Sequence, residues 1–159
     1  MRTQASWATF EADVPDLAAE ARNLLRRGGG DSGFLATVGG SNVAPRIHPV
    51  SVAIVDGALL VFVLPSAKRT DLEQDGRFAF HAHQDPDMPG ELSLRGRAVE
   101  VTDAIRRGAA VAAWPFEPDD TYRLFELQIE TVVVGRRTSA DEWPPRYETR
   151  SAARAGATS

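Results

Sequence analysis

The chain of 159 residues contains no cysteine. Disulfide bridges, thiolate metal sites and cysteine nucleophiles are therefore excluded. Long apolar runs are missing too, since no stretch approaches the roughly 20 residues of a membrane span, and residues 1–10 lack the pattern of a signal peptide. We therefore expect a cytoplasmic protein that makes no contact with a membrane.

An excess of positive charge is also absent. The formal net charge is −4, which argues against a nucleic-acid binder with a broad basic face. The hydrophobic fraction of 43% is sufficient for a core, and a chain of this length usually forms one domain. We predict a single domain over residues 1–150 and a frayed tail over residues 151–159.

Two helix signals follow one another near the N-terminus. Ser6 is suited to cap a short helix that runs through Asp13. Pro15 is suited to the first position of a second helix, because its missing N–H would have no partner there. Apolar residues recur at helical spacing as far as Arg27. Two further helices are predicted, over Ser66–Asp75 and from Thr102 or Asp103 to about Ala113.

The middle of the chain changes to the period of a strand. Strands are expected over residues 33–38, 43–55, 58–64, 77–83, 92–101 and 122–134, and Asp56-Gly57 is a strong hairpin signal. Pro45 and Pro49 interrupt the second strand, and since proline removes a ladder donor, that backbone should lie at an edge, a bulge or a ligand. Six mostly antiparallel strands with a few helices predict a mainly β (α+β) fold, as a small barrel or closed sheet.

The first candidate site is the segment Pro45-Arg46-Ile47-His48-Pro49-Val50. Side chains alternate along a strand, so Arg46 and His48 share a face. One interpretation is an edge strand with two solvated polar residues, which the spacing alone favours. In the other, Pro49 leaves backbone groups open for a planar polar ligand, and Arg46 supplies charge or a stacking plane.

The second candidate site is Ser66-Ala67-Lys68-Arg69, directly after an apolar strand. A hydroxyl, two cations and the free N–H groups of a helix start lie within four residues. This combination suits a phosphate, which favours helix N-termini and charge-assisted hydrogen bonds. An ordinary solvated helix start is the alternative.

Two other strands carry notable residues. The glycine of Leu94-Arg95-Gly96-Arg97-Ala98 indicates a bulge or a close backbone approach, and the two arginines share a face toward solvent or a cofactor. His81 and His83 also share a face. No further ligand has a convincing spacing, so we predict no metal site.

Five segments occur in a characteristic order between residues 34 and 103. They are Phe34-Leu35-Ala36-Thr37-Val38, Pro45-x-Ile47-x-Pro49-Val50, Asp56-Gly57, Ser66-x-Lys68-x-x-x-Leu72 and Leu94-x-Gly96-x-Ala98. Their succession, over roughly half of the chain, resembles the pyridoxamine-phosphate-oxidase-like superfamily of flavin-binding split β-barrels. The resemblance implies a six-stranded antiparallel split β-barrel with a few flanking helices, assembled as a homodimer with two cofactor sites at the subunit interface.

The resemblance also implies which residues bind the cofactor, FMN. The ring would lie along the backbone of Arg46, Ile47, His48, Pro49, Val50 and Ser51. The phosphate would be held by Ser66, Lys68 and Arg69. Trp143, or a neighbour from the other subunit, would cover the ring.

Two departures from the superfamily pattern bear on function. Asp71 stands where the family often has asparagine, and a carboxylate near a phosphate is unfavourable unless it orients Lys68 or Arg69. The C-terminal segment Trp143–Arg150 contains no histidine, whereas true pyridoxamine-phosphate oxidases carry an arginine–histidine substrate motif there. Oxidation of pyridoxamine phosphate is therefore not expected.

The leading hypothesis is an FMN-dependent oxidoreductase that passes a hydride to or from a small conjugated substrate. The ring would carry the redox chemistry, while the protein supplies orientation, electrostatics and exclusion of water. No catalytic residue is identified by the sequence, although His48 would be a candidate proton donor.

Three alternatives stay open. A deazaflavin would need more basic groove for its anionic tail, from Arg22, Arg26 and Arg27. A non-catalytic protein would bind flavin or haem, with His48, His81 or His83 as axial ligand. A barrel that has lost its ligand would persist as a dimeric interaction module.

Overall fold

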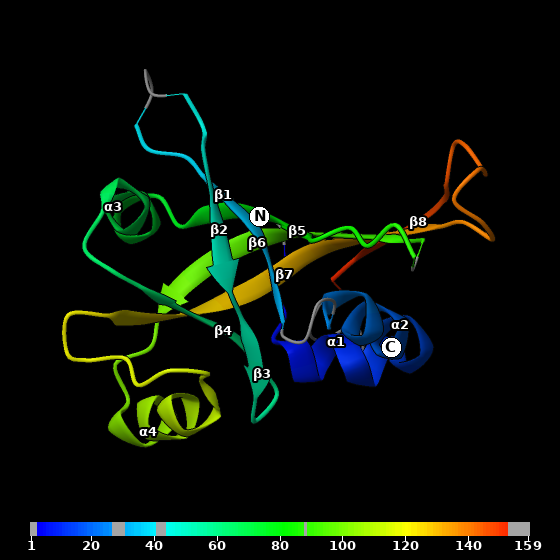
Figure 1. The fold of residues 1–159 in the computed structure, drawn as a ribbon. Coiled ribbons are helices and arrows are strands. Elements are labelled where there is room, and N and C mark those ends of the chain that lie inside the picture. The colour runs from blue at the N-terminus through cyan, green and yellow to red at the C-terminus, as the bar shows by residue number, and fades with distance from the viewer. Residues whose placement is uncertain (1–2, 27–30, 41–43, 88, 153–159) are drawn as a thin grey trace.

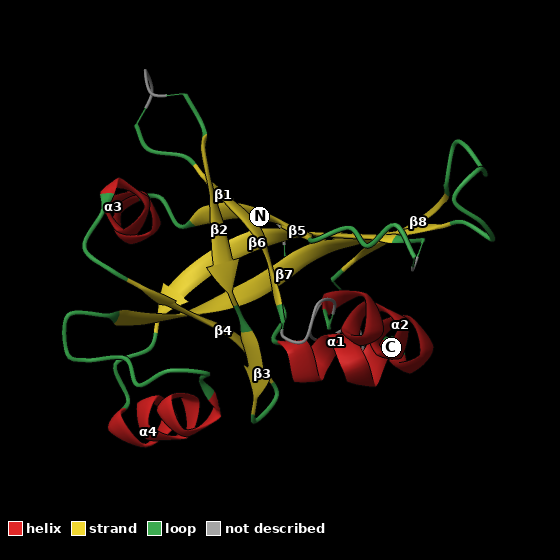
Figure 2. Cartoon of the chain, in the orientation of Figure 1, coloured by secondary structure: helices red, strands yellow, loops and turns green. Residues whose placement is uncertain are grey.

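The computed structural model describes residues 3–26, 31–40, 44–87 and 89–152. Its strands form a mainly antiparallel curled half-barrel sheet flanked by four helices (Figures 1 and 2). The helices are α1 (Trp7–Asp13), α2 (Pro15–Leu25), α3 (Ala67–Gln74) and α4 (Ala104–Ala113). The strands are β1 (Ser32–Thr37), β2 (Arg46–Ser51), β3 (Ala53–Val55), β4 (Ala58–Val63), β5 (Arg77–Ala82), β6 (Glu91–Glu100), β7 (Arg123–Arg136) and β8 (Arg146–Ser151).

The predicted helix starts are confirmed. The Ser6 hydroxyl accepts the N–H of Thr9 at 3.1 Å, and Pro15 occupies the first turn of α2. The Asp103 carboxylate caps α4 by accepting the N–H of Arg106 at 2.8 Å. None of the described helices is long and apolar enough to span a membrane.

The predicted strand number is wrong, because the described part of the chain forms a sheet of eight strands rather than six. The expected strand over residues 43–55 divides at Val52 into β2 and β3, and its first residue lies outside the described part of the chain. The missed strand is β8, which pairs with β7 but has no apolar alternation to reveal it. Ser151, the first residue of the predicted tail, pairs with Thr131, and residues 153–159 lie outside the description.

The curvature of the sheet brings its two ends together. The strand order is β2-β1-β5-β6-β7-β4-β3, so the two end strands are consecutive in the chain. Val52, which is buried, joins them and donates its N–H to the carbonyl of Asp31 at 3.0 Å. Beyond the pair Ala53–Leu60, the segment turns toward β1, and the rest of β4 pairs with β7 alone. The ladder is therefore open between β2 and the end of β4.

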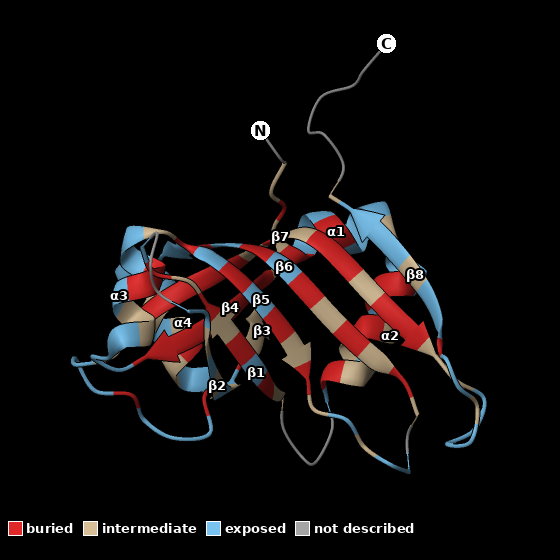
Figure 3. Ribbon diagram, turned by 90° about the horizontal axis from the view of Figure 1, so that it is seen from above, coloured by how far each residue is buried: buried red, intermediate tan, exposed pale blue. Residues whose placement is uncertain are grey.

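Two apolar clusters lie on opposite faces of β4. Leu59, Val61 and Val63 belong to the main core, which also includes residues of α1 and α2. Leu60 and Phe62 belong to a smaller cluster beneath α4. Because both faces are covered, all six residues of β4 are buried, and Figure 3 shows it among the most buried of the strands.

A bulge interrupts the pairing of β6 with β7 at Gly96, as the sequence predicted. The register shifts between Arg95 and Gly96, which leaves Glu130 of β7 without an opposite residue. A Cβ atom at Gly96 would lie 1.8 Å from the carbonyl oxygen of Gln128. Glycine is therefore required here by the closeness of the neighbouring backbone.

Replacing Gly96 with alanine is expected to lower the free energy of unfolding by about 1–3 kcal/mol, because one strand must move. Denaturant unfolding followed by tryptophan fluorescence measures the loss. Gly108 on α4 is the matched control, since a Cβ there would meet nothing within 4 Å. Replacing Gly108 with alanine is expected to raise the free energy of unfolding by about 0.5–1 kcal/mol, because alanine favours the helix more than glycine does. Equal losses in the two variants would contradict the role given to the close approach.

Candidate functional site

A pocket of about 160 Å³ occupies the open part of the ladder between β2 and β4. Lys68 of α3 and the residues Trp114 and Phe116 just after α4 line it, and Figure 1 shows these two helices on either side of the end of β4. Its lining consists of Pro49, Val50, Ser51, Phe62, Leu64, Lys68, Trp114, Phe116 and Tyr122. Three predicted site residues from β2 thus meet one predicted residue from α3.

The backbone of β2 explains why this side of the strand is open. Hydrogen-bonding directions alternate along an antiparallel strand. Because the N–H of Val52 points to Asp31, the backbone groups of Ile47, Pro49 and Ser51 point the other way, away from β1, and Pro49 and Ser51 line the pocket. Pro49 has no N–H and therefore loses no ladder bond. The expectation that the prolines mark an edge is confirmed at this residue.

Lys68 is the only lysine in a chain with 18 basic residues. It lies at the start of α3, half-buried, and lines the pocket opposite Pro49. Burial lowers the pKa of its ammonium group, because desolvation disfavours the charged form. No other residue of the lining carries a charge. Lys68 is therefore the cation of this pocket.

The other two predicted phosphate ligands are already engaged. The Ser66 hydroxyl caps α3, since it accepts the N–H of Arg69 at 3.2 Å and donates to the Leu64 carbonyl at 2.9 Å. The Arg69 guanidinium donates to the carbonyl of Thr121 at 2.8 Å and lies 3.4 Å from Glu73. Both residues border the pocket rather than line it, and their role in binding a cofactor stays a prediction.

Arg46 and His48 share a face of β2, as predicted, but that face is half-buried rather than solvated. His48 stands opposite Leu35, a fully buried core residue, and its Nε2 atom is buried without a hydrogen-bond partner. The side chain of Ile47, on the opposite face, is 66% exposed. Arg46, Ile47 and His48 are thus outside the pocket lining.

Asp71 joins α3 to the first two strands. Its buried carboxylate accepts the Thr37 hydroxyl at 2.8 Å and lies 3.4 Å from Nε of Arg46. It also lies against Gly39, where a Cβ would meet Oδ1 at 2.0 Å. The carboxylate therefore orients Arg46 rather than Lys68 or Arg69. It fixes α3, and with it Lys68, relative to β2.

The aromatic side of the pocket was missed by the sequence analysis. Phe62 packs edge-on against Trp114 with ring centres 4.9 Å apart, and Phe116 lies 5.6 Å from Tyr122. We call Phe62, Trp114, Phe116 and Tyr122 the aromatic wall. The cluster of aromatic residues just after α4 was the available signal, but their pairing with β4 depends on the fold.

Arg107 on α4 holds this wall in place. Its guanidinium donates to the carbonyls of Tyr122 and Asp119, both at 2.9 Å. The same group lies 5.2 Å from the centre of the Phe62 ring, a cation–π distance. The loop between α4 and β7 is thus fastened at its C-terminal end.

Three further predicted residues lie elsewhere. Trp143, 74% exposed, belongs to the β7–β8 loop, on the opposite side of the molecule from α3 (Figures 1 and 3). His81 contacts the carbonyl of Ala82 at 2.6 Å, and His83 packs edge-on against Phe34. Within the described residues, no group of three or more histidine or carboxylate side chains is arranged to hold a metal ion.

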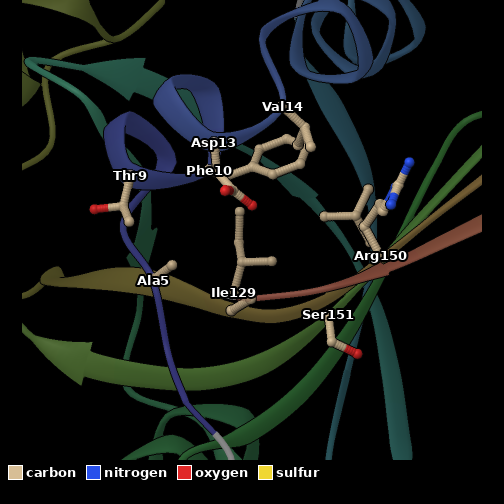
Figure 4. Close-up of a pocket in the computed structure, with 10 residues that line it drawn as sticks. Ala5, Thr9, Phe10, Asp13, Val14, Ile129, Arg150 and Ser151 are labelled. Atoms are coloured by element: carbon tan, nitrogen blue, oxygen red, sulfur yellow. The ribbon is translucent and has the colours of Figure 1, made fainter. Parts of the chain in front are cut away.

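Two other hollows differ in character. The first, of about 10 Å³, lies between α1, β7 and β8, where Phe10 and Ile129 point toward one another (Figure 4). It has room for about one water molecule. The second, of about 330 Å³, contains Arg136, whose guanidinium is bound by Glu20 at 2.6 Å and Glu148 at 2.8 Å. Arg150 also lies 3.0 Å from Glu148, so both arginines of this hollow are paired with carboxylates.

No family model matches the sequence, and no curated protein matches it. Solved structures do match. A protein of the pyridoxinephosphate oxidase family related to general stress protein 26 of Bacillus subtilis, from Clostridium acetobutylicum, is 15% identical, with a TM-score of 0.61 over 84% of this chain and 92% of that one.

Two further structures carry cofactors in their names. A FAD-binding protein from Mesorhizobium loti is 22% identical, with a TM-score of 0.55 over 74% of this chain and 92% of that one. A heme binding protein from Mycobacterium smegmatis is 18% identical, with a TM-score of 0.60 over 84% of this chain but only 58% of that one. These likenesses confirm the predicted resemblance at the level of the fold, which is that of pyridoxamine-phosphate-oxidase-like split barrels.

Replacing Asp71 with alanine is expected to lower the free energy of unfolding by about 3 kcal/mol, because Arg46 and Thr37 lose their buried partner. Asp71→Asn keeps an acceptor for Thr37 and is expected to lose less. Thermal unfolding monitored by circular dichroism measures both. Arg77→Ala, which breaks an exposed pair with Asp75, is the control and should change little. If Asp71→Ala lowers the stability no more than this control does, the Asp71 carboxylate does not fix α3 to the first two strands.

Proposed function

We propose that the protein binds FMN in the pocket between β2 and β4 and is an FMN-dependent oxidoreductase, distinct from true pyridoxamine-phosphate oxidases. The observation that carries the proposal is the meeting of an unpaired strand backbone with Lys68 across one pocket. The free backbone groups of Ile47, Pro49 and Ser51 suit the polar edge of a planar ring. The ammonium group of Lys68 suits a phosphate. When bound, FMN supplies hydride chemistry on a small conjugated substrate.

The second copy in a homodimer would complete the site. The pocket of about 160 Å³ is smaller than the roughly 300–1,000 Å³ of typical cofactor sites. One lysine also leaves a doubly charged phosphate only partly neutralised. A small volume and a single cation are expected if each subunit supplies only part of the cofactor site. Trp143 or its neighbours in the partner copy are candidates to cover the ring.

An exposed apolar patch borders the pocket and fits such an interface. Phe34 is 42% exposed and Ile47 66% exposed. Phe34 stands opposite Pro49, and Ala36 stands opposite Ile47, so all four side chains share one face. We call them the outer patch. Since Pro49 also lines the pocket, a copy seated on the patch would reach the cofactor.

The alternatives find less support in the site. Two of the arginines suggested for a deazaflavin tail are paired, Arg22 with Glu11 and Arg26 with Asp31, and Arg27 lies outside the described residues. No histidine lines the pocket. Nε2 of His48 is enclosed, so a haem would have to recruit an axial ligand from elsewhere. These observations favour FMN over a deazaflavin or a haem as the ligand that we propose.

Substitution of Lys68 tests the phosphate contact directly. Lys68→Ala is expected to weaken FMN binding about 10–100-fold, the value of one charge-assisted contact. Quenching of FMN fluorescence during titration measures the affinity. Riboflavin, which has the ring but no phosphate, is the control ligand and should bind both proteins equally. If neither compound binds the unmodified protein, the proposed function fails.

The affinity for FMN should also depend on pH. Only the protonated amine attracts phosphate, and burial lowers the pKa of Lys68. Affinity is therefore expected to fall as the pH rises through this pKa, earlier than for an ordinary lysine. Lys68→Arg should remove the decline, because a guanidinium stays protonated. A decline of the same size with riboflavin would assign the effect to another group.

Ile47→Glu is expected to convert a dimer into a monomer, because it places a charge inside the outer patch. Sedimentation velocity measures the change, and FMN binding should weaken with it. Ile105→Glu on α4 is the matched control: Ile105 is 84% exposed and lies outside the patch. If the Ile47 variant remains dimeric, the interface lies on another surface.

A further inference from the structure

We propose that the substrate is an uncharged, flat, apolar molecule and that Phe116 is the residue that selects it. This inference rests on the proposed FMN site, because it concerns the part of the pocket that the phosphate would leave free. Lys68 would hold the phosphate, and the aromatic wall supplies four of the nine residues that line the pocket. A molecule that reacts with the ring would therefore lie against aromatic faces.

The lining of the pocket excludes a strong charge on the substrate. Lys68 is its only charged side chain, and a bound phosphate would occupy that cation. Ser51 and the Tyr122 hydroxyl are the other polar side chains of the lining. Neither can compensate the desolvation of an ionised group, which is costly without a partner. An uncharged substrate with few polar atoms avoids this cost.

Acidic residues beside the wall act further against anions. The loop that carries Phe116 also carries Glu117, Asp119 and Asp120, all exposed. The pKa of the Asp119 carboxyl is lowered, mainly by the hydrogen bond from the Thr121 hydroxyl, so it is ionised at neutral pH. Arg107 is already bound to two carbonyls on the same loop. The loop that carries Phe116 thus exposes three carboxylates, which disfavour an anion beside that ring.

Phe116 differs from the other members of the wall. Trp114 is 8% exposed and Phe62 is 7% exposed, and both belong to the cluster beneath α4. Phe116 is 47% exposed although it lines the pocket and contacts Tyr122. Its ring is thus available to a ligand, whereas removal of the others would disturb the core. These facts make Phe116 the specificity-determining residue.

Three fused-ring probes of similar size test the proposal on FMN-loaded protein. They are 2-naphthol, which is uncharged, naphthalene-2-sulfonate, an anion, and N-methylquinolinium, a cation. Equilibrium dialysis gives each affinity, and a long-wavelength absorption band between 2-naphthol and the flavin reports stacking on the ring. We expect 2-naphthol to bind at least about tenfold more tightly than either ion, as expected when an unpaired charge is desolvated.

On protein saturated with FMN, Phe116→Ala is expected to weaken 2-naphthol binding about tenfold and to reduce the absorption band, because a stacking contact is lost. Phe116→Tyr should retain the affinity, and Ile105→Ala is the control for an exposed apolar residue. Tighter binding of either ion, or an unchanged 2-naphthol affinity in Phe116→Ala, overturns the inference. Failure of FMN to bind would be seen beforehand, in the absence of the probes, and would overturn the proposed function instead.

Discussion

The architecture depends on one constraint: a single chain segment supplies both end strands of the curled sheet. Residues on either side of Val52 pair with β1 and with β4 respectively, and they cannot do both at the same point. The segment therefore leaves part of β4 and one edge of β2 without a ladder partner. Unpaired strand edges tend to recruit other polar groups. The opening is thus both a consequence of the topology and the place where a ligand is expected.

Local chemistry made much of this fold predictable. Asp56 and Gly57 have positive φ values of 48° and 76°, which a tight hairpin requires, and both were recognisable as a pair. Helix caps and Gly96 are equally local signals. The division at Val52 was not predictable, because alternation runs through it unchanged and the bend is set by the neighbours on each side. β8 has no apolar alternation, and its backbone pairs with β7.

The candidate site also has features that local sequence predicted and features that it did not. Pro49 and Lys68 were identified because residue type and position alone suggested open backbone and a cation. The engagement of Arg69 was not predictable, since its partner Thr121 lies 52 positions away in the sequence. The orientation of Arg46 by Asp71, 25 positions later, has the same origin. Contacts of this kind are set by the topology of the fold, so the sequence pattern identifies the residues but does not predict which of them will be partners.

The basic residues of the chain differ in whether a neighbouring group already binds them, and this difference leaves Lys68 available to a ligand. Several arginines of this chain are bound to carboxylates or carbonyls, as in the contacts of Arg69, Arg107 and Arg136, and a planar fork suits such fixed arrangements. The single lysine is instead left in a pocket without a partner in the lining. A compact ammonium group and the aromatic wall line the same pocket, so its lining is chemically uneven. A ligand with an anionic group and a flat apolar part would match this lining better in one orientation than in the reverse, because only one orientation pairs the anion with Lys68.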